Sequence, residues 1–130
     1  MIDLAPVRAF LEPRHHAMGD LALEFGAAEL TDAHPSDDAE ARDLARRFCG
    51  ALGDRGLLVP VAEQDFRACC VLRETLAAFS PLADAVFALQ ALGSTPIAIA
   101  GSDELRAEWL EPAIAGNRVA AFAMTEPGAG

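Results

Sequence analysis

Hydrophobic residues recur at intervals of three and four positions along most of this chain, which is the spacing of one face of a helix rather than of a strand. Capping residues such as Ser36, Ser80 and Ser102 interrupt the pattern and mark where helices start. Helices are predicted over residues 4–12, 14–30, 37–52, 63–79, 81–92 and 103–115. The fold class that follows is all-α.

Three apolar stretches do not fit the face of a long helix. Residues 57–61 (Leu-Leu-Val-Pro-Val) are expected to form an extended connector that crosses the core, because five such residues are poorly placed in water. Residues 97–100 are expected to form a short apolar turn, capped by residues 94–96 and closed by Gly101. Residues 118–124 are expected to form a buried strand.

Two of the predicted helices differ in how much surface they bury. The helix over residues 81–92 is apolar on nearly all sides, which indicates burial against several neighbours, and Gly93 is expected to end it. The helix that Ser36 is expected to cap is amphipathic instead. Its exposed face includes an acid-first pair at a spacing of four, Asp43 and Arg47, which stabilises a helix slightly.

Composition supports a helical domain and narrows its partners. The chain has 130 residues, enough for one domain with a core, and 52% of them are hydrophobic while Tyr is absent. Its formal charge is −10. An acidic surface repels nucleic acid and anionic lipid, so neither is an expected partner.

The cysteines and the hydropathy indicate in which cellular compartment the protein is expected. Cys49, Cys69 and Cys70 do not have the spacing of a metal site, and we expect them to be small apolar residues within helices. Their odd number and the lack of a signal peptide favour a reducing compartment, which we take to be the cytoplasm. No apolar run reaches about 18 residues without a charge or a breaker, so no membrane span is expected.

The histidines and carboxylates do not form a recognisable chemical site. His15 and His16 are adjacent, so they lie about 100° apart on a helix and cannot share a metal ion. Both are expected to be solvated. No pair of carboxylates and no His-Glu cluster falls at ligand spacing on one helix face, so a metal site and an acid/base enzyme built on this chain have little support.

The end of the chain carries the most informative stretch, Ala-Phe-Ala-Met-Thr-Glu-Pro-Gly-Ala-Gly at residues 121–130. An apolar segment that runs into a Gly-rich turn allows a ligand to approach the backbone, because Gly has no Cβ. Backbone N–H groups in such a turn can face an anion or an electron-rich ring, and the Thr125 hydroxyl adds a further polar group. Taken alone, such a stretch is more often an ordinary turn than a ligand site.

Residues 124–130 (Met-Thr-Glu-Pro-Gly-Ala-Gly) resemble the first signature of the acyl-CoA dehydrogenases, which normally continues with Ser or Thr and then Asp. Residues 90–102 are also similar to this family, as is the spacing of Trp109-Leu110 and Gly116. The resemblance covers roughly residues 80–130. Because the sequence stops within the signature, we expect it to be a fragment.

Upstream, the resemblance is limited to the order of the helices and to Gly56-Leu57 leading to Pro60. The family usually has a Pro-Glu…Gly-Gly loop after this proline, where residues 60–64 here read Pro-Val-Ala-Glu-Gln. The wall of the substrate channel that this loop forms is therefore expected to be altered.

The resemblance implies an N-terminal helical domain at residues 1–117, followed at residues 118–130 by the first strand of a truncated FAD-binding β domain. It implies FAD as the cofactor, with these residues against the flavin ring: Phe122, Met124, Thr125 and Gly130. It places four residues at the inner end of the acyl pocket, although plain core packing is the alternative for each: Phe87, Ala88, Leu92 and Pro96. The catalytic base of the family lies downstream, so this chain would contain no catalytic residue.

The activity that the resemblance implies is α,β-dehydrogenation of an acyl-CoA thioester, with an electron-transfer partner and a homo-tetrameric assembly. This chain alone would be inactive. The alternative hypothesis is a free-standing acidic all-α module that binds another protein and ends in an ordinary turn. The DNA after codon 130 distinguishes the two, because the first hypothesis requires Ser or Thr followed by Asp and then β-rich sequence, and the second requires a stop codon.

Overall fold

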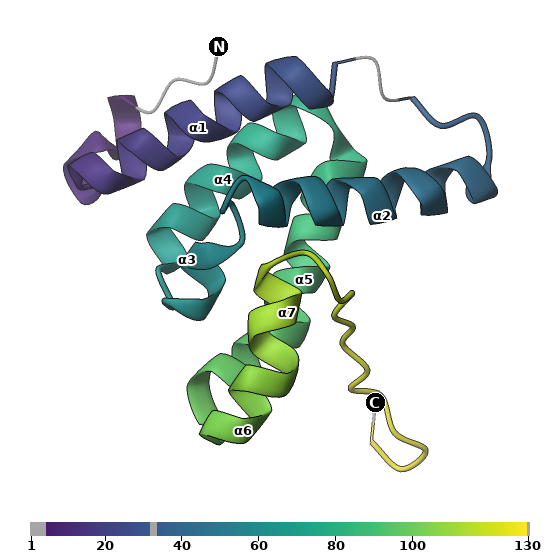
Figure 1. Cartoon of the computed structure of the whole chain (residues 1–130). Helices are drawn as coiled ribbons and strands as arrows, with labels where there is room; N and C mark the ends of the chain where they lie inside the picture. Colours follow the sequence, from purple (N-terminus) through teal and green to yellow (C-terminus); the bar gives the residue numbers. More distant parts are fainter. Residues whose placement is uncertain (1–4, 32–33, 130) are drawn as a thin grey trace.

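The computed structural model describes residues 5–31 and 34–129. Helices make up most of this part of the chain, which confirms the all-α prediction (Figure 1). In chain order they are η1 (Ala5–Phe10), α1 (Pro13–Glu29), α2 (Asp38–Asp54), α3 (Val59–Ala62), α4 (Phe66–Phe79), α5 (Pro81–Ala100), α6 (Asp103–Leu105), the π-helical turn η2 (Arg106–Leu110) and α7 (Glu111–Ile114).

Helix α5 is the central element of the arrangement. It packs against α4 and α2 along its first half and against η2 and α7 along its second, while α1 lies on α4 (Figure 1). The hydrophobic core forms where these helices meet. It comprises Ala22, Phe25, Leu30, Leu44, Phe48, Leu52, Leu57, Leu58, Val61, Leu72, Leu76, Ala83 and Phe87.

Helix α5 is longer than predicted, because it continues through Gly93 and Pro96 to Ala100. The short turn predicted over residues 97–100 is therefore wrong, since these residues are its last turn. Gly93 does not end the helix as predicted, and its lack of a side chain serves close packing instead. A Cβ atom at this position would lie 2.8 Å from the Cβ of Ala120, so the glycine allows the end of the chain to lie directly against the helix.

By length and hydropathy alone, α5 is able to cross a membrane. The sequence prediction treated Gly93 and Pro96 as breaks in the apolar run, and the structure shows one continuous helix of 20 residues. Core helices of globular domains have the same length and composition, and α5 packs against α2, α3 and α4 here. The absence of a membrane span stays a prediction.

The apolar stretch at residues 57–61 is buried as predicted, but it is not extended. Leu57 and Leu58 are fully buried in a turn, and Pro60 lies in the first turn of α3, where its missing N–H removes no hydrogen bond. Helix α4 accordingly begins at Phe66, three residues later than predicted, after Asp65 as its N-cap. A proline at the first helical turn favours a helix over a connector.

Three helices end in the same hydrogen-bonded motif, with a residue of positive φ just after the C-cap. Gly56 follows α2 with φ 69°, Gly116 follows α7 with φ 74°, and Gln64 follows α3 with φ 58°. After α3, the Asp65 N–H donates to Pro60 O and the Gln64 N–H donates to Val61 O, as in a Schellman motif. Glycine occupies this position in two of the three motifs, and glutamine occupies it in the third.

We predict that Gln64→Gly raises the free energy of unfolding by about 0.5–1 kcal/mol, because the steric penalty of the left-handed conformation that glycine removes is larger than the loss of the long hydrogen bond, 3.4 Å, from Gln64 Nε2 to Ala98 O. Urea denaturation measures this. The matched control is Gly56→Ala, which should lower stability by about 1 kcal/mol, since its Cβ would make only an ordinary contact with Val59 Cγ2 at 3.9 Å and the cost is that of the left-handed backbone. A loss of stability in Gln64→Gly would contradict this explanation of the turn.

The N-cap of α2 differs from the prediction by one residue. Asp37 is the N-cap and accepts hydrogen bonds from the N–H groups of Ala39 and Glu40, whereas Ser36, the predicted cap, donates to the Glu40 carboxylate. Asp43 pairs with Arg46 at 2.8 Å instead of with Arg47.

The strand predicted over residues 118–124 does not form. Residues 119–125 have no regular secondary structure, and an isolated bridge between Glu126 and Ala129 closes the turn that follows. A strand needs a neighbouring strand for its backbone hydrogen bonds, and the described part of this chain supplies helices instead.

Candidate functional site

The four predicted acyl-pocket residues separate into two groups on α5. Phe87 is fully buried and belongs to the hydrophobic core. Ala88, Leu92 and Pro96 follow one another at a spacing of four, so they share one face, on which Leu92 is 50% exposed and Pro96 is exposed. The structure thus brings three of the four together on an open apolar face, and places Phe87 behind it.

The predicted flavin-contacting residues lie in the exposed end of the chain. Phe122 is 48% exposed and Met124 is 73% exposed, and Thr125 is exposed beside them. Gly130 lies outside the described residues. Glu126 and Ala129 exchange backbone hydrogen bonds of 2.9 and 3.2 Å, which close a tight turn over Pro127 and Gly128. The turn predicted from the sequence is therefore present.

Hollows lie on both sides of the segment that leads to this turn. One, of about 390 Å³, lies between α5, η2, α7 and the chain end, and its wall includes the Arg118 guanidinium stacked 4.4 Å above the ring of Trp109. The other, of about 240 Å³, lies between α2 and α5. Val119 and Ala120 line both hollows, so this segment divides them.

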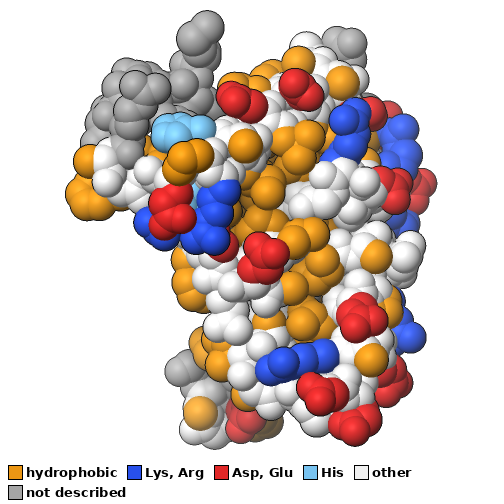
Figure 2. All heavy atoms as spheres, turned by 60° about the vertical axis from the view of Figure 1, so that its left-hand side comes forward, with side chains coloured by type: hydrophobic (Ala, Val, Ile, Leu, Met, Phe, Trp, Pro, Cys, Tyr) orange, Lys and Arg blue, Asp and Glu red, His pale blue; other side chains and the backbone are white. Residues whose placement is uncertain are grey.

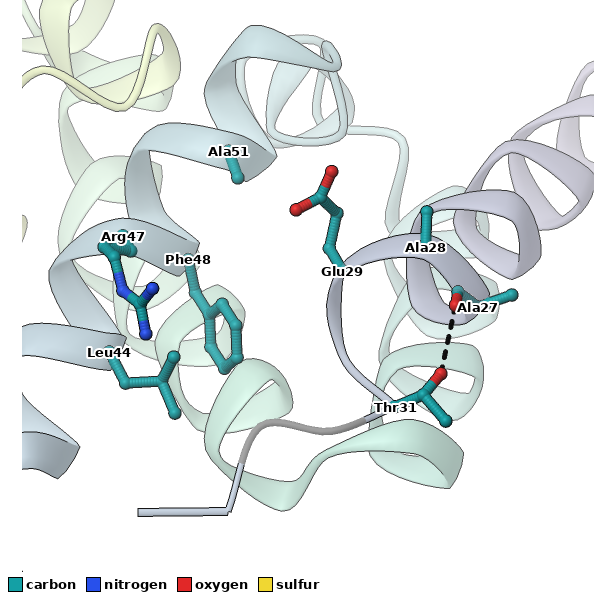
Figure 3. A pocket seen from close by; sticks show the side chains of 8 residues that line it. All are labelled: Ala27, Ala28, Glu29, Thr31, Leu44, Arg47, Phe48 and Ala51. Carbon is teal, nitrogen blue, oxygen red and sulfur yellow. Dashed lines mark hydrogen bonds between the residues drawn. The ribbon is translucent and has the colours of Figure 1, made fainter.

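A further hollow, of about 340 Å³, lies between the end of α1 and the middle of α2. In Figure 3, Arg47 and Phe48 lie on its α2 wall and Glu29 lies on its α1 wall, where Thr31 donates a hydrogen bond to Ala27 O. None of the predicted site residues borders it. It is a cleft between two helices that make few contacts with each other, since α1 packs mainly on α4 and α2 packs mainly on α5.

His15 and Asp65 form a buried polar pair that the sequence analysis missed. His15 is fully buried, which corrects the expectation that it is solvated. Its Nδ1 accepts the backbone N–H of Glu12 at 2.8 Å, so the proton lies on Nε2, which is 3.1 Å from both carboxylate oxygens of Asp65. Residues 15 and 65 are 50 positions apart, and no local pattern connects them.

Asp65 serves three partners at once. Its carboxylate accepts the N–H of Ala68 as the N-cap of α4, accepts the Nε2–H of His15, and lies 3.3 Å from Arg14. Burial alone would raise the pKa of Asp65, but these hydrogen bonds and the charge of Arg14 lower it below its usual value. The pair therefore joins the start of α1 to the start of α4, and its role is structural.

The cysteines differ from one another in exposure. Cys49 is buried and its thiol donates to Gly116 O at 3.8 Å, as expected for a packing residue. Cys69 is half-buried, and burial raises its pKa to about 11, so its thiol is protonated and unreactive at neutral pH. Cys70 is exposed, which corrects the expectation that all three pack inside. Across the described residues, no group of three or more His, Cys, Asp or Glu side chains is placed to hold a metal ion.

The surface combines acidic charge with exposed apolar side chains. Figure 2 shows a band of hydrophobic side chains that runs down one face between charged groups. The large hydrophobic residues that are exposed are Val7, Phe10, Val59, Phe66, Leu89, Leu92, Ile99, Leu105, Trp109, Val119, Phe122 and Met124. Contiguous apolar patches mark surfaces that contact something else, whereas single exposed hydrophobic residues are normal.

Residues 12–117 match the family model described as the acyl-CoA dehydrogenase N-terminal domain. The chain belongs to the acyl-CoA dehydrogenase family. The match covers every helix from α1 to α7, including the face formed by Ala88, Leu92 and Pro96, and it ends just before the segment that leads to Thr125. The roles of the predicted site residues and the domain boundary after residue 117 stay predictions.

A curated relative extends beyond this domain. The chain is 29% identical over 129 residues to a 3-(aryl)acrylate reductase of Clostridium sporogenes (strain ATCC 15579). The alignment covers 93% of this chain and 34% of the reductase, so the chain spans about a third of the length of this relative.

Proposed function

We propose that this chain is the N-terminal helical part of a FAD-dependent acyl-CoA dehydrogenase-type flavoenzyme, which acts on the α,β carbon–carbon bond of an acyl thioester. The observation that carries the proposal is the family match over residues 12–117, followed after residues 118–123 by a sequence that resembles the family's Met-Thr-Glu-Pro-Gly signature, on an exposed turn. The oxidoreductase name of the Clostridium relative supports the same reaction class.

The residues present fit a flavin. Phe122, Met124 and Thr125 are exposed, and a Cβ atom built on Gly128 would meet nothing within 4 Å, so the turn leaves room for a planar ring. When bound, FAD would supply the hydride acceptor for the α,β bond. Among these side chains, the Thr125 hydroxyl is the one able to donate a hydrogen bond toward the ring.

The remaining parts of the turn have a supporting role. Backbone donors that are already oriented stabilise charge on a reduced ring without having to reorganise. The Glu126 backbone closes the turn, and we propose that its carboxylate is not the catalytic base, because a negative charge beside the ring would oppose reduction. The base would lie in the part of the enzyme that this chain does not contain, so the chain alone is inactive.

The acyl group is proposed to lie against the face formed by Ala88, Leu92 and Pro96. This face is apolar and open, so it can accommodate a hydrocarbon chain or an aryl group without unpaired polar contacts. The relative is a reductase of a 3-(aryl)acrylate, and reduction and dehydrogenation concern the same bond. Acyl-CoA as substrate, an electron-transfer partner, a homo-tetramer and a cytoplasmic location complete the proposal.

The test uses the polypeptide encoded by the complete reading frame that contains this chain. We predict that it purifies with FAD, and that butanoyl-CoA or 3-phenylpropanoyl-CoA bleaches the visible flavin absorption in the absence of oxygen. The 130-residue chain mixed with FAD and the same thioesters should produce no bleaching. Bleaching by the 130-residue chain, or a complete polypeptide that binds no FAD, would contradict the proposal.

A protein-interaction module is the second candidate, and the apolar side chains exposed on an acidic chain favour it. It predicts a stop codon directly after codon 130 and no response to FAD. The flavoenzyme predicts Ser or Thr and then Asp at this position.

A further inference from the structure

The buried amide of Gln90 holds the end of the chain against α5. Gln90 is 3% exposed, and its Nε2 donates to Ala113 O and to Arg118 O, both at 3.0 Å. Its Oε1 accepts the backbone N–H of Ala120. One side chain therefore connects α5 to the last turn of α7 and to two points of the segment that follows.

Only an amide satisfies this set of partners. The two carbonyl groups of Ala113 and Arg118 require donors, and the N–H of Ala120 requires an acceptor, which fixes the orientation of the Gln90 amide. A glutamate would retain the acceptor but present a negative charge to two carbonyl oxygens. A leucine would leave all three backbone groups without this partner in a buried position.

Gly93 lies one helical turn further along, on the same side of α5. A Cβ atom here would lie 2.8 Å from the Cβ of Ala120 and 2.8 Å from Ala121 O, distances that real Cβ contacts do not reach. The backbone of residues 120–121 is thus in direct contact with the backbone of the helix. The stacking of Arg118 on Trp109 fixes the start of the same segment.

We propose that Gln90 and Gly93 form a seat for residues 118–121 that sets the position from which the Thr125 turn emerges. Gln90 and Gly93 are then positioning residues, and they act on the cofactor through this segment. The second half of this inference rests on the proposed flavin function, whereas the seat itself does not. Neither residue stood out as a positioning residue in the sequence, where Gly93 was expected to end a helix.

The seat predicts how fast the Ala120 backbone N–H exchanges with solvent. In the full 130-residue chain, NMR-detected hydrogen exchange at Ala120 should be about tenfold faster in Gln90→Leu, because the N–H loses its acceptor. Gly93→Ala should have the same effect by displacing the segment, and it is less prone to unfolding because alanine favours the helix. Unchanged exchange at Ala120 in both variants would overturn the seat.

Two matched controls separate the seat from a general loss of stability. Thr95→Val removes a hydrogen bond to Ala91 O on the same helix, and Gly50→Ala adds a methyl group to α2 where nothing lies within 4 Å. Neither should change exchange at Ala120. An equal acceleration in Thr95→Val would mean that the effect is global, and it would also overturn the seat.

The positioning role is tested in the polypeptide encoded by the complete reading frame. We expect Gln90→Leu and Gly93→Ala to shift the visible flavin spectrum and to weaken retention of FAD about tenfold, while Thr95→Val leaves both unchanged. Faster exchange at Ala120 with an unchanged flavin would overturn the positioning role and leave the seat standing. A wild-type polypeptide that binds no FAD would contradict the proposed function and would overturn the positioning role with it. The seat itself is tested only by the hydrogen exchange at Ala120.

Discussion

Replacing Phe87 by alanine is expected to lower the free energy of unfolding by about 3–5 kcal/mol, because the ring is fully buried and its removal leaves a cavity in the hydrophobic core. Domains of this size are stable by only about 5–15 kcal/mol, so the loss is a large share of the total. Urea denaturation at neutral pH measures it as a lower midpoint.

Leu92→Ala is the matched control on the same helix. Leu92 is 50% exposed in this chain, so its truncation should lower stability by less than about 1 kcal/mol. The sequence analysis left two roles open for both Phe87 and Leu92, lining of the acyl pocket and plain core packing. The difference in stability between the two variants distinguishes these roles. If Phe87→Ala were as mild as Leu92→Ala, Phe87 would border open space and not the core, in contradiction to the structure.

Asp65→Ala is expected to lower the free energy of unfolding by about 2–4 kcal/mol. The substitution removes the N-cap of α4, worth about 0.5–2 kcal/mol, and it leaves the Nε2–H of buried His15 without an acceptor, worth about 1–3 kcal/mol. Thermal or urea unfolding of the variant measures the difference from wild type at pH 7.

This difference should depend on pH in a defined direction. The pKa of Asp65 is lower in the folded chain than in the unfolded chain, so the stabilisation is complete above an unfolded pKa of about 3.9 and is lost as the pH falls through the folded value. Asp65→Asn is the control, because its neutral amide oxygen can still accept from Ala68 and its charge does not change. The advantage of the wild type over Asp65→Asn should shrink as the pH falls below about 3.9, and an advantage that grew as the pH fell would mean a raised pKa of Asp65 in the folded chain and would contradict this account.

The long helices could be predicted because their apolar faces repeat with the helical period over many residues. Helices α1 and α2 begin and end within two residues of the predicted positions. The prediction of helix ends failed at a glycine and a proline, because these residues can lie inside a helix as well as end one. Gly93 and Pro96 commonly end helices, yet the contacts of α5 with α7 and the chain end keep this helix continuous.

The polar contacts were harder to predict than the helices, because they join distant parts of the chain. His15 lies next to His16 in the sequence, and nothing local shows that the first is buried against Asp65 while the second is partly exposed. The strand over residues 118–124 failed for a related reason. Its apolar sequence fits a strand, but pairing requires a partner strand that the described helices do not provide.

The candidate site was predicted mainly from the signature at residues 124–130 and not from periodicity. The turn at Glu126 to Ala129 and the shared face of Ala88, Leu92 and Pro96 are both present in the structure. Gln90 was not recognised, since its three partners belong to backbone groups that only the fold brings together.

The most direct test of the central claim is a crystal structure of the polypeptide encoded by the complete reading frame, grown with FAD. We expect the backbone amides of Met124 and Thr125 to face the isoalloxazine ring at hydrogen-bonding distance, with Gln90 still bonded to Arg118 and Ala120. A flavin bound elsewhere, or these amides turned toward solvent, would contradict the claim.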